Sequence, residues 1–294
     1  MNSTDHFRPT RDSGDLFVPD GSAPQAALAR TTHLCIAAHP DDAEWIGYHG
    51  VAACFDHADA WFTAAIVTDG AGSVRGGPHA HLTATELVGV RRAEQRRAAE
   101  LGRYAAAAQL GWPSSAARDG GNDALRDELV ALLAATRPTH VYVHAPTDRH
   151  ATHVGVCARA LEALRRADRD LGLRPERVLG VEGWGDLDWL APEDRVALDV
   201  SARPHLFAAL IGAHDSQIEG GKRYDLAMAA RWRANATFAE PRALDRADAV
   251  ALAVDLTAAA RHGGPSPDAV VAGLCERFER DVRERLTGVD PRAE

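Results

Sequence analysis

The stretch that decides the fold is Thr31–Gly50, which reads TTHLCIAAHPDDAEWIGYHG. Its apolar run from Leu34 to Ala38 has the length of a buried strand, and a segment compatible with a helix follows. Between the two lie the four residues His-Pro-Asp-Asp at positions 39–42. Parallel α/β sheets place their ligand sites beyond the carboxyl ends of their strands, so this turn is a candidate site.

Strands and helices alternate through the residues that follow. We expect a helix around 44–55 and a long one over 85–101, and Asn122 is placed to cap a helix that ends near 136. Such alternation is the signature of a parallel sheet with right-handed crossovers. The sequence therefore predicts an α/β fold. Its expected strands are 34–38, 61–68, 104–110, 139–144, 178–181 and 196–200, and further helices are expected at 154–167 and 204–213.

The chain has 294 residues, enough to bury the core of one large domain, and we predict one domain with additions. Residues 1–30 show no sustained periodicity and are expected to form an N-terminal extension that wraps the surface or frays. Residues 31–220 are expected to form the core. Residues 221–294 are expected to form a mainly helical region packed on it, whose last helix opens with Ser266 and Pro267.

Charge and composition limit the possible partners and compartment. The formal net charge is −9, from 42 acidic and 33 basic residues without a long basic block, which argues against a nucleic-acid surface. Neither a signal-peptide core nor a run long enough to span a bilayer is visible, so we expect a cytoplasmic protein with no membrane partner. The four cysteines lie far apart and are expected to be free thiols, namely Cys35, Cys54, Cys157 and Cys275.

His39, Asp42 and His153 together have the composition of a catalytic metal site. Two imidazoles and one carboxylate leave coordination positions open on a zinc-sized ion, so that water can bind and be acidified. His39 and Asp42 share one turn, and His153 follows another expected strand. Asp41 would then be a base next to metal-bound water, and His150, if protonated, would be a donor to a developing oxyanion.

A simpler interpretation exists for each half of this group. His-Pro-Asp-Asp is also typical of a turn in which Asp caps a helix. His150 and His153, taken alone, are more typical of surface or core residues than of ligands. The occurrence of both motifs after two strands, with acids attached, favours the metal site.

Two motifs carry a family resemblance, and they stand in a characteristic order and separation. The chain resembles the LmbE-like (PIG-L) family of metal-dependent N-acetylglucosaminyl deacetylases. The match extends over roughly residues 34–217, with a Thr-Asp-Gly loop at 68–70 and a helix at 91–102 that are individually weak. The two motifs are Ala38-His39-Pro40-Asp41-Asp42 and Pro146-x-Asp148-x-His150-x-x-His153.

The resemblance implies a Rossmann-like α/β fold with a mostly parallel sheet flanked by helices. It implies one zinc ion held by His39, Asp42 and His153, with Asp41 as general base and His150 as the group that stabilises the oxyanion. The implied reaction is hydrolysis of an N-acetyl group from an amino sugar, which releases acetate and a free amine. The ligand set also suits Fe²⁺.

The chain departs from the common family pattern near both motifs. Ala43 follows the Asp pair where many members have Glu, and His49-Gly50 replaces a usual glycine pair. Thr152 precedes His153 where Asp is frequent. These changes remove no ligand, but the loss of an acid changes the surroundings of the neighbouring histidines.

Sugar hydroxyls need convergent polar groups on the loops around the metal. The residues near these loops also have interpretations that involve no substrate. These are a solvated Arg75, exposed loop histidines at 79 and 81, a core Trp184 and a structural His214. The stretch 222–238 mixes basic and aromatic residues and is either a contact for an anionic or aglycone part of the substrate or a solvated helix. The candidate substrate contacts are Asp69, Ser73, Arg75, Glu182 and Trp184.

The favoured hypothesis is therefore a zinc-dependent N-deacetylase of an amino sugar in a small glycoconjugate, such as a thiol-sugar or an antibiotic precursor. A zinc amidohydrolase for a longer acyl group and a non-catalytic sugar-binding remnant are the alternatives. The partner is a small-molecule N-acetylated amino sugar, and a homo-oligomer is possible because the C-terminal helices could cover a subunit contact.

Overall fold

The computed structural model describes residues 7–239 and 244–288, and its centre is a single mixed sheet of eight strands. Five neighbouring strands run parallel in the order β4-β3-β2-β5-β6, and β1 and β8 pair antiparallel with the two outer members. The strands are β1 (Asp15–Phe17), β2 (His33–Ala37), β3 (Phe62–Thr68), β4 (Ala106–Trp112), β5 (His140–His144), β6 (Arg177–Val181), β7 (Val196–Asp199) and β8 (Val250–Asp255).

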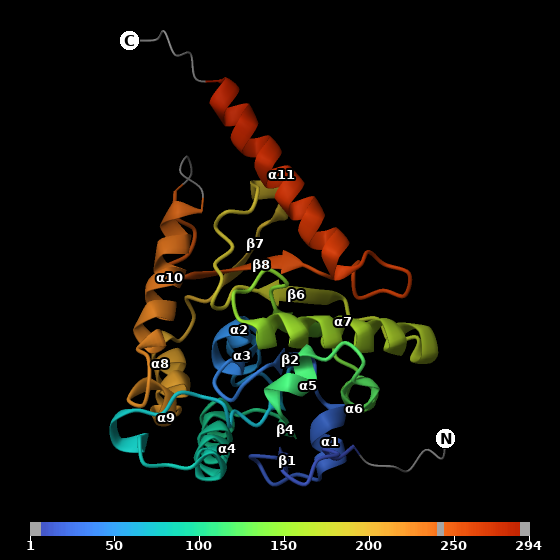
Figure 1. Cartoon of the computed structure of the whole chain (residues 1–294), viewed down its shortest axis with the longest axis vertical. Helices are drawn as coiled ribbons and strands as arrows, with labels where there is room; N and C mark the ends of the chain where they lie inside the picture. Colours follow the sequence, from blue (N-terminus) through green and yellow to red (C-terminus); the bar gives the residue numbers. More distant parts are fainter. Residues whose placement is uncertain (1–6, 240–243, 289–294) are drawn as a thin grey trace.

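Helices cover both faces of the sheet, so the molecule has three layers (Figure 1). One face packs against α1 (Pro24–Ala29), α6 (Asp123–Thr136), α7 (Ala151–Leu171) and α11 (Pro267–Thr287). The other packs against α2 (Ala43–Ile46), α3 (Tyr48–Cys54), α4 (Ala84–Leu101), α8 (Pro204–Gly212) and α10 (Tyr224–Phe238). The shorter helices are α5 (Ser114–Arg118), α9 (Asp215–Ile218) and the 3-10 turns η1 (Gly77–His79) and η2 (Pro192–Asp194).

Strand β2 is central because its side chains are apolar on both faces. Leu34 and Ile36 enter one core and Cys35 and Ala37 enter the other, which is the pattern of a parallel strand covered on both sides. Its neighbours β3 and β5 pair with it in register over most of its length. The loops that leave β2 and β5 at their carboxyl ends therefore lie side by side, as expected for a ligand site.

The α/β fold with a mostly parallel sheet and the helical C-terminal region are confirmed. The expected helix at 44–55 is two helices, because the chain turns at Gly47 where it packs closely. A Cβ there would lie 2.6 Å from the carbonyl oxygen of Ala43 and 2.8 Å from the ring of Phe62. No such crowding is visible in the hydrophobic pattern alone.

Elements that were not expected from the sequence include β1, α1 and β8. The N-terminal residues do more than wrap the surface, since β1 adds an edge strand to β4 and α1 buries Leu28; residues 1–6 lie outside the described part. Strand β8 interrupts the mainly helical C-terminal region and lies between β6 and β7. The proposed boundaries at 30 and 220 remain predictions.

The cysteines are free, as expected; Cys35, Cys54 and Cys157 are buried and Cys275 is exposed. Within residues 7–239 and 244–288, no helix is both long enough and apolar enough to cross a membrane.

Two stacked histidines lie at the other end of the sheet, where β2 and β5 begin. His33 and His140 are register partners whose ring centroids are 4.6 Å apart. Burial, with His140 and His49 nearby, lowers the pKa of His33 to about 4. Burial also lowers the pKa of His140. Both rings are therefore neutral in the folded protein at pH values at which unfolded histidines begin to charge.

We predict that stability falls as the pH drops below about 6.5 and continues to fall toward the folded pKa of about 4, because the unfolded chain then binds the additional protons. His33→Gln should reduce this loss, measured by urea unfolding at pH 7 and pH 5. His205→Gln, at an exposed position of α8, is the control. An unchanged pH dependence in His33→Gln would contradict the prediction.

Candidate metal centre

The predicted ligands come from two loops at the carboxyl ends of adjacent strands. His39 and Asp42 lie in the loop after β2, and His153 lies in the first turn of α7, which follows β5. Asp42 occupies the N-cap position of α2, but its carboxylate makes no capping bond. Instead, Asp42 Oδ2 accepts a hydrogen bond from the backbone N–H of His39 at 2.7 Å. The simple helix-cap interpretation is therefore wrong for Asp42.

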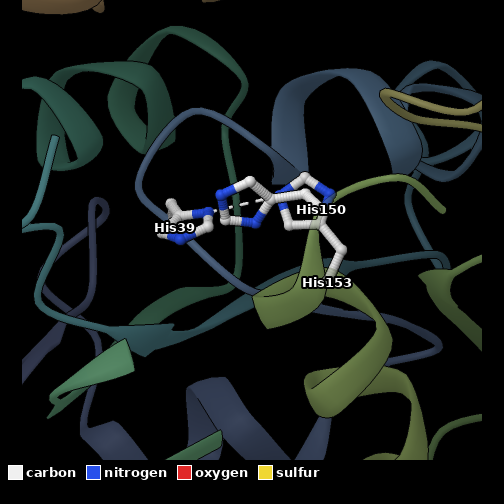
Figure 2. A group of neighbouring side chains, drawn as sticks. All are labelled: His39, His150 and His153. Carbon is white, nitrogen blue, oxygen red and sulfur yellow. Dashed lines mark hydrogen bonds between the residues drawn. The ribbon is translucent and has the colours of Figure 1, made fainter. Parts of the chain in front are cut away.

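The three potential donor atoms form a compact triangle. His39 Nδ1 lies 3.0 Å from Asp42 Oδ2, and His153 Nε2 lies 3.3 Å from each of these atoms. Ligand atoms of a tetrahedral zinc ion with bonds of about 2.0–2.1 Å are separated by roughly 3.3 Å. Figure 2 shows that the imidazoles of His39 and His153 point toward one another, with His150 beside them. The residues therefore fit a single metal ion that keeps open positions.

His144, the last residue of β5, is a part of the site that the sequence analysis did not identify. Its ring stacks on that of His153 at a centroid distance of 3.9 Å, and its Nε2 lies 3.5 Å from Asp42 Oδ2. That Nε2 already accepts a hydrogen bond from the backbone N–H of Ala38. Because its lone pair is used in this way, we assign His144 to the support of His153 and not to the ligand set.

Asp148 holds His153 in place from behind. Its Oδ2 lies 3.3 Å from His153 Nδ1, and its Oδ1 accepts a hydrogen bond from the backbone N–H of His150 at 2.7 Å. Burial disfavours the charged imidazole, but Asp42 and Asp148 raise the pKa of His153 to about 10. A carboxylate behind a ligating histidine fixes its orientation. Many family members have an acid at the position before this histidine, where this chain has Thr152. Asp148 thus supplies an acid next to His153 from another position.

Asp41 is held by three groups from distant parts of the chain. Its Oδ2 accepts hydrogen bonds from Tyr224 Oη at 2.6 Å and from the buried Arg91 at 3.1 Å. Its backbone N–H donates to Gln95 Oε1 at 3.3 Å. The residue has φ of 106°, a strained value for a side chain other than glycine. Oδ1 has no hydrogen-bond partner among the described residues, so it is available to accept a proton.

Burial raises the pKa of Asp41, although Arg91 opposes this effect. By contrast, the pKa of Asp42 lies well below its usual range despite burial, because His153 and the other imidazoles stabilise its charge. The two neighbouring carboxyl groups are thus in different environments. This difference is typical of a pair with separate roles, in which Asp42 is a ligand and Asp41 an acid or base.

His150 borders the same space but is exposed. Its ring makes an edge contact with His39 at a centroid distance of 5.1 Å and lies 4.6 Å from that of His153. Burial and the two neighbouring imidazoles lower its pKa. A neutral imidazole still carries one N–H, so His150 remains able to donate a hydrogen bond.

A buried polar network supports the loop that carries these residues. Glu44 is fully buried and accepts hydrogen bonds from Gln95 at 2.8 Å and from Tyr104 at 3.0 Å. His214 Nε2 lies 3.2 Å from its other carboxylate oxygen. The structural interpretation of His214 is therefore favoured over a substrate contact.

The candidate substrate contacts differ in their burial and in their hydrogen bonds. The half-buried Asp69 closes its own turn onto Ala71, and Ser73 Oγ accepts from Arg91. Arg75 is exposed and donates to the carbonyl of Leu82 at 3.2 Å. Trp184 keeps 37% of its surface exposed. A contact of these four residues with substrate remains a prediction.

Glu182 lies in a different position from the one expected of a sugar contact. It is fully buried, and its Oε1 accepts from Asn235 at 2.6 Å and from the backbone of Leu252 at 3.0 Å. Leu252 belongs to β8, the strand that the sequence analysis missed. These surroundings do not support a sugar contact and are those of a structural carboxyl group that joins β6 to β8.

The fold is α/β, and the donor triangle is a His-Asp-His group that could hold a metal ion. Residues 34–164 match the family model described as PIG-L, GlcNAc-PI de-N-acetylase. Over these residues, which make up less than half of the chain, the sequence is therefore similar to the PIG-L (LmbE-like) family. Comparison with curated proteins finds no match.

Solved structures with the same fold include a conserved protein of Thermus thermophilus, 23% identical, with a TM-score of 0.60 over 76% of this chain and 93% of that one. The N,N'-diacetylchitobiose deacetylase of Pyrococcus horikoshii is 19% identical, with a TM-score of 0.54 over 76% and 84%. The 4-carboxy-2-hydroxymuconate hydratase of Pseudomonas putida is 16% identical, with a TM-score of 0.54 over 77% and 95%. At these identities the likeness concerns the fold.

We predict that Zn²⁺ raises the melting temperature of metal-free protein, because the ion binds only the folded donor triangle; a concentration 100 times the Kd contributes about 2.7 kcal/mol. His39→Ala should abolish most of this rise. His79→Ala, which removes a loop histidine that pairs with Asp215, should retain it. Equal shifts in both variants, or none in the unsubstituted protein, would refute the site.

Proposed function

We propose that this chain is a metal-dependent hydrolase that removes the N-acetyl group from an amino sugar. The observation that carries the proposal is the donor triangle, preceded in the chain by Asp41, whose Oδ2 is held by Tyr224 and Arg91. The similarity to the PIG-L family supports it. The likeness to a deacetylase of diacetylchitobiose supports the same class of reaction.

Each residue has a defined role in amide hydrolysis. A divalent ion held by His39, Asp42 and His153 would polarise the amide carbonyl and acidify a water molecule. Asp41 takes the proton of that water as it attacks the carbonyl carbon and returns a proton to the leaving nitrogen. The N–H of His150 stabilises the negative charge on the former carbonyl oxygen. One amide and one water thus give acetate and a free amine.

Tyr224 and Arg91 control the direction in which Asp41 presents its free oxygen. Both donate to Oδ2, so rotation of the carboxyl group would break two hydrogen bonds. A base must be held within hydrogen-bond distance of the proton that it removes, and small displacements are costly. We therefore assign both as positioning residues for Asp41.

The finer assignment concerns metal and substrate. We propose zinc as the metal, with Fe²⁺ as the alternative that the same donors accept. The substrate is a small glycoconjugate, such as a thiol-sugar or an antibiotic precursor, and the proposed compartment is the cytoplasm. The competing functions are hydrolysis of a longer N-acyl amide and sugar binding without catalysis. The first would release a longer acid, and the second would release no acid.

We predict that metal-loaded protein releases acetate from at least one member of a panel of N-acetyl amino sugars. Asp41→Asn should reduce kcat by about 10²–10⁴-fold, because it removes the base but keeps the size of the side chain. Metal content should stay the same, measured on the same sample. Longer acids released from acyl amides without acetate would indicate the second function, and turnover retained in Asp41→Asn would refute the mechanism.

Tyr224→Phe should lower kcat by about tenfold and leave KM nearly unchanged, because one hydrogen bond to a charged group is lost while the substrate contacts persist. Steady-state kinetics on the best substrate of the panel measures this split. Tyr48→Phe is the matched control, since the Tyr48 hydroxyl donates to backbone carbonyls of residues 202 and 203 away from the site. A rise in KM alone would assign Tyr224 to substrate binding.

A further inference from the structure

The backbone of Trp184 is hydrogen-bonded to Asp148, whose carboxylate also lies next to the proposed metal ligand His153. Its backbone N–H donates to Asp148 Oδ2 at 3.0 Å, and this oxygen also lies 3.3 Å from His153 Nδ1. The preceding Gly183 allows this close approach, since a Cβ there would lie 2.5 Å from Asp148 Oδ2. The backbone of Trp184 is therefore held close to His153.

A line of aromatic rings connects this indole to the proposed base. Trp184 makes an edge contact with Trp45 at a centroid distance of 6.5 Å, and Trp45 lies 5.6 Å from Tyr224. The hydroxyl of Tyr224 reaches Asp41. Trp45 is 4% exposed, and its indole N–H has no partner among the described residues. We call Trp45, Trp184 and Tyr224 the aromatic wall.

Lys222 places a positive charge at the exposed end of the aromatic wall. Its ammonium lies 4.6 Å from the ring centroid of Trp184. Lys222 is the only lysine in the chain, and all other basic residues are arginines. Within the described part of the chain, no carboxylate lies within ion-pair distance of it. An exposed ammonium without a partner has donors available for a ligand.

The neighbouring cations are engaged in contacts within the protein. Arg223 pairs with Asp225 at 2.7 Å. Arg231 donates to the carbonyl of Gly183 and so supports the loop that carries Trp184. Of these three basic residues, only Lys222 has neither an ion pair nor a hydrogen bond from its charged group among the described residues.

Lys222 adds a positive charge to a chain whose formal net charge is −9. A local cation favours an anionic ligand, and a divalent ion at the donor triangle would add to this effect. An ammonium over a partly exposed indole suits a sugar ring that carries an acidic group, because the acid pairs with the amine while the ring packs on the part of the indole that stays exposed.

We propose that Lys222 and Trp184 form a subsite that selects N-acetyl amino sugars bearing an acidic substituent, either a carboxylate or a phosphate. This subsite deepens the proposed deacetylase function and rests on it. The ammonium pairs with the acid, the indole packs on the ring, and the acetamide is directed toward Asp41 and the metal donors.

The first experiment compares kcat/KM for three sugars: N-acetylmuramic acid, N-acetylglucosamine 1-phosphate and neutral N-acetylglucosamine. The unsubstituted protein should prefer at least one acidic sugar. Lys222→Met should lower the ratio of acidic to neutral kcat/KM about tenfold through KM, and Lys222→Arg should restore part of it. Arg223→Gln is the matched control and should keep the ratio. The preferred acidic sugar identifies carboxylate or phosphate as the recognised group.

A ratio that is unchanged in Lys222→Met, or lowered equally in Arg223→Gln, would overturn the subsite while the deacetylase function stands. The second measurement is independent of turnover. Reductive methylation marks Lys222 as the only side-chain amine, and mass spectrometry reads its extent. Protection by an acidic sugar, but not by N-acetylglucosamine, supports the subsite even if no sugar is hydrolysed; equal protection by both, or by neither, overturns it.

Discussion

The carboxylate of Asp42 is the contact on which the site depends. Its Oδ2 accepts from the backbone of His39, and the imidazoles of His39, His153 and His144 lie within 3.5 Å of it. It therefore joins the loop after β2 to the strand end and helix start of β5 and α7. A buried carboxylate surrounded by imidazoles is costly without a shared positive charge. A divalent ion held by these residues would supply that charge.

The surroundings of Asp41 and Asp42 differ, in keeping with the different roles proposed for them. Asp42 faces imidazoles, whereas Asp41 is buried and strained and is held at one oxygen by Tyr224 and Arg91. Arg91 comes from the long helix α4, and Tyr224 begins α10 in the region beyond the family match. The C-terminal region therefore completes the site by fixing the proposed base.

The sequence predicts those parts of the site whose residues lie close together along the chain. The apolar run of β2, the acid pair after it and the histidines before α7 were all visible in the pattern, because strand ends and helix starts have local signals. Tyr224 was not assigned to Asp41, since the two lie 183 residues apart and only the packing of α10 joins them. Strand β8 was not expected from the sequence, so the burial of Glu182 beside it could not be predicted either.

The most direct test of the account is a crystal structure of the zinc-loaded protein with anomalous scattering measured at the zinc edge. The account predicts one peak per chain, about 2.0–2.1 Å from His39 Nδ1, from His153 Nε2 and from a carboxylate oxygen of Asp42. It also predicts Asp41 next to the metal without coordinating it. A peak bound through His144 or Asp41, or no peak among these residues, would contradict it.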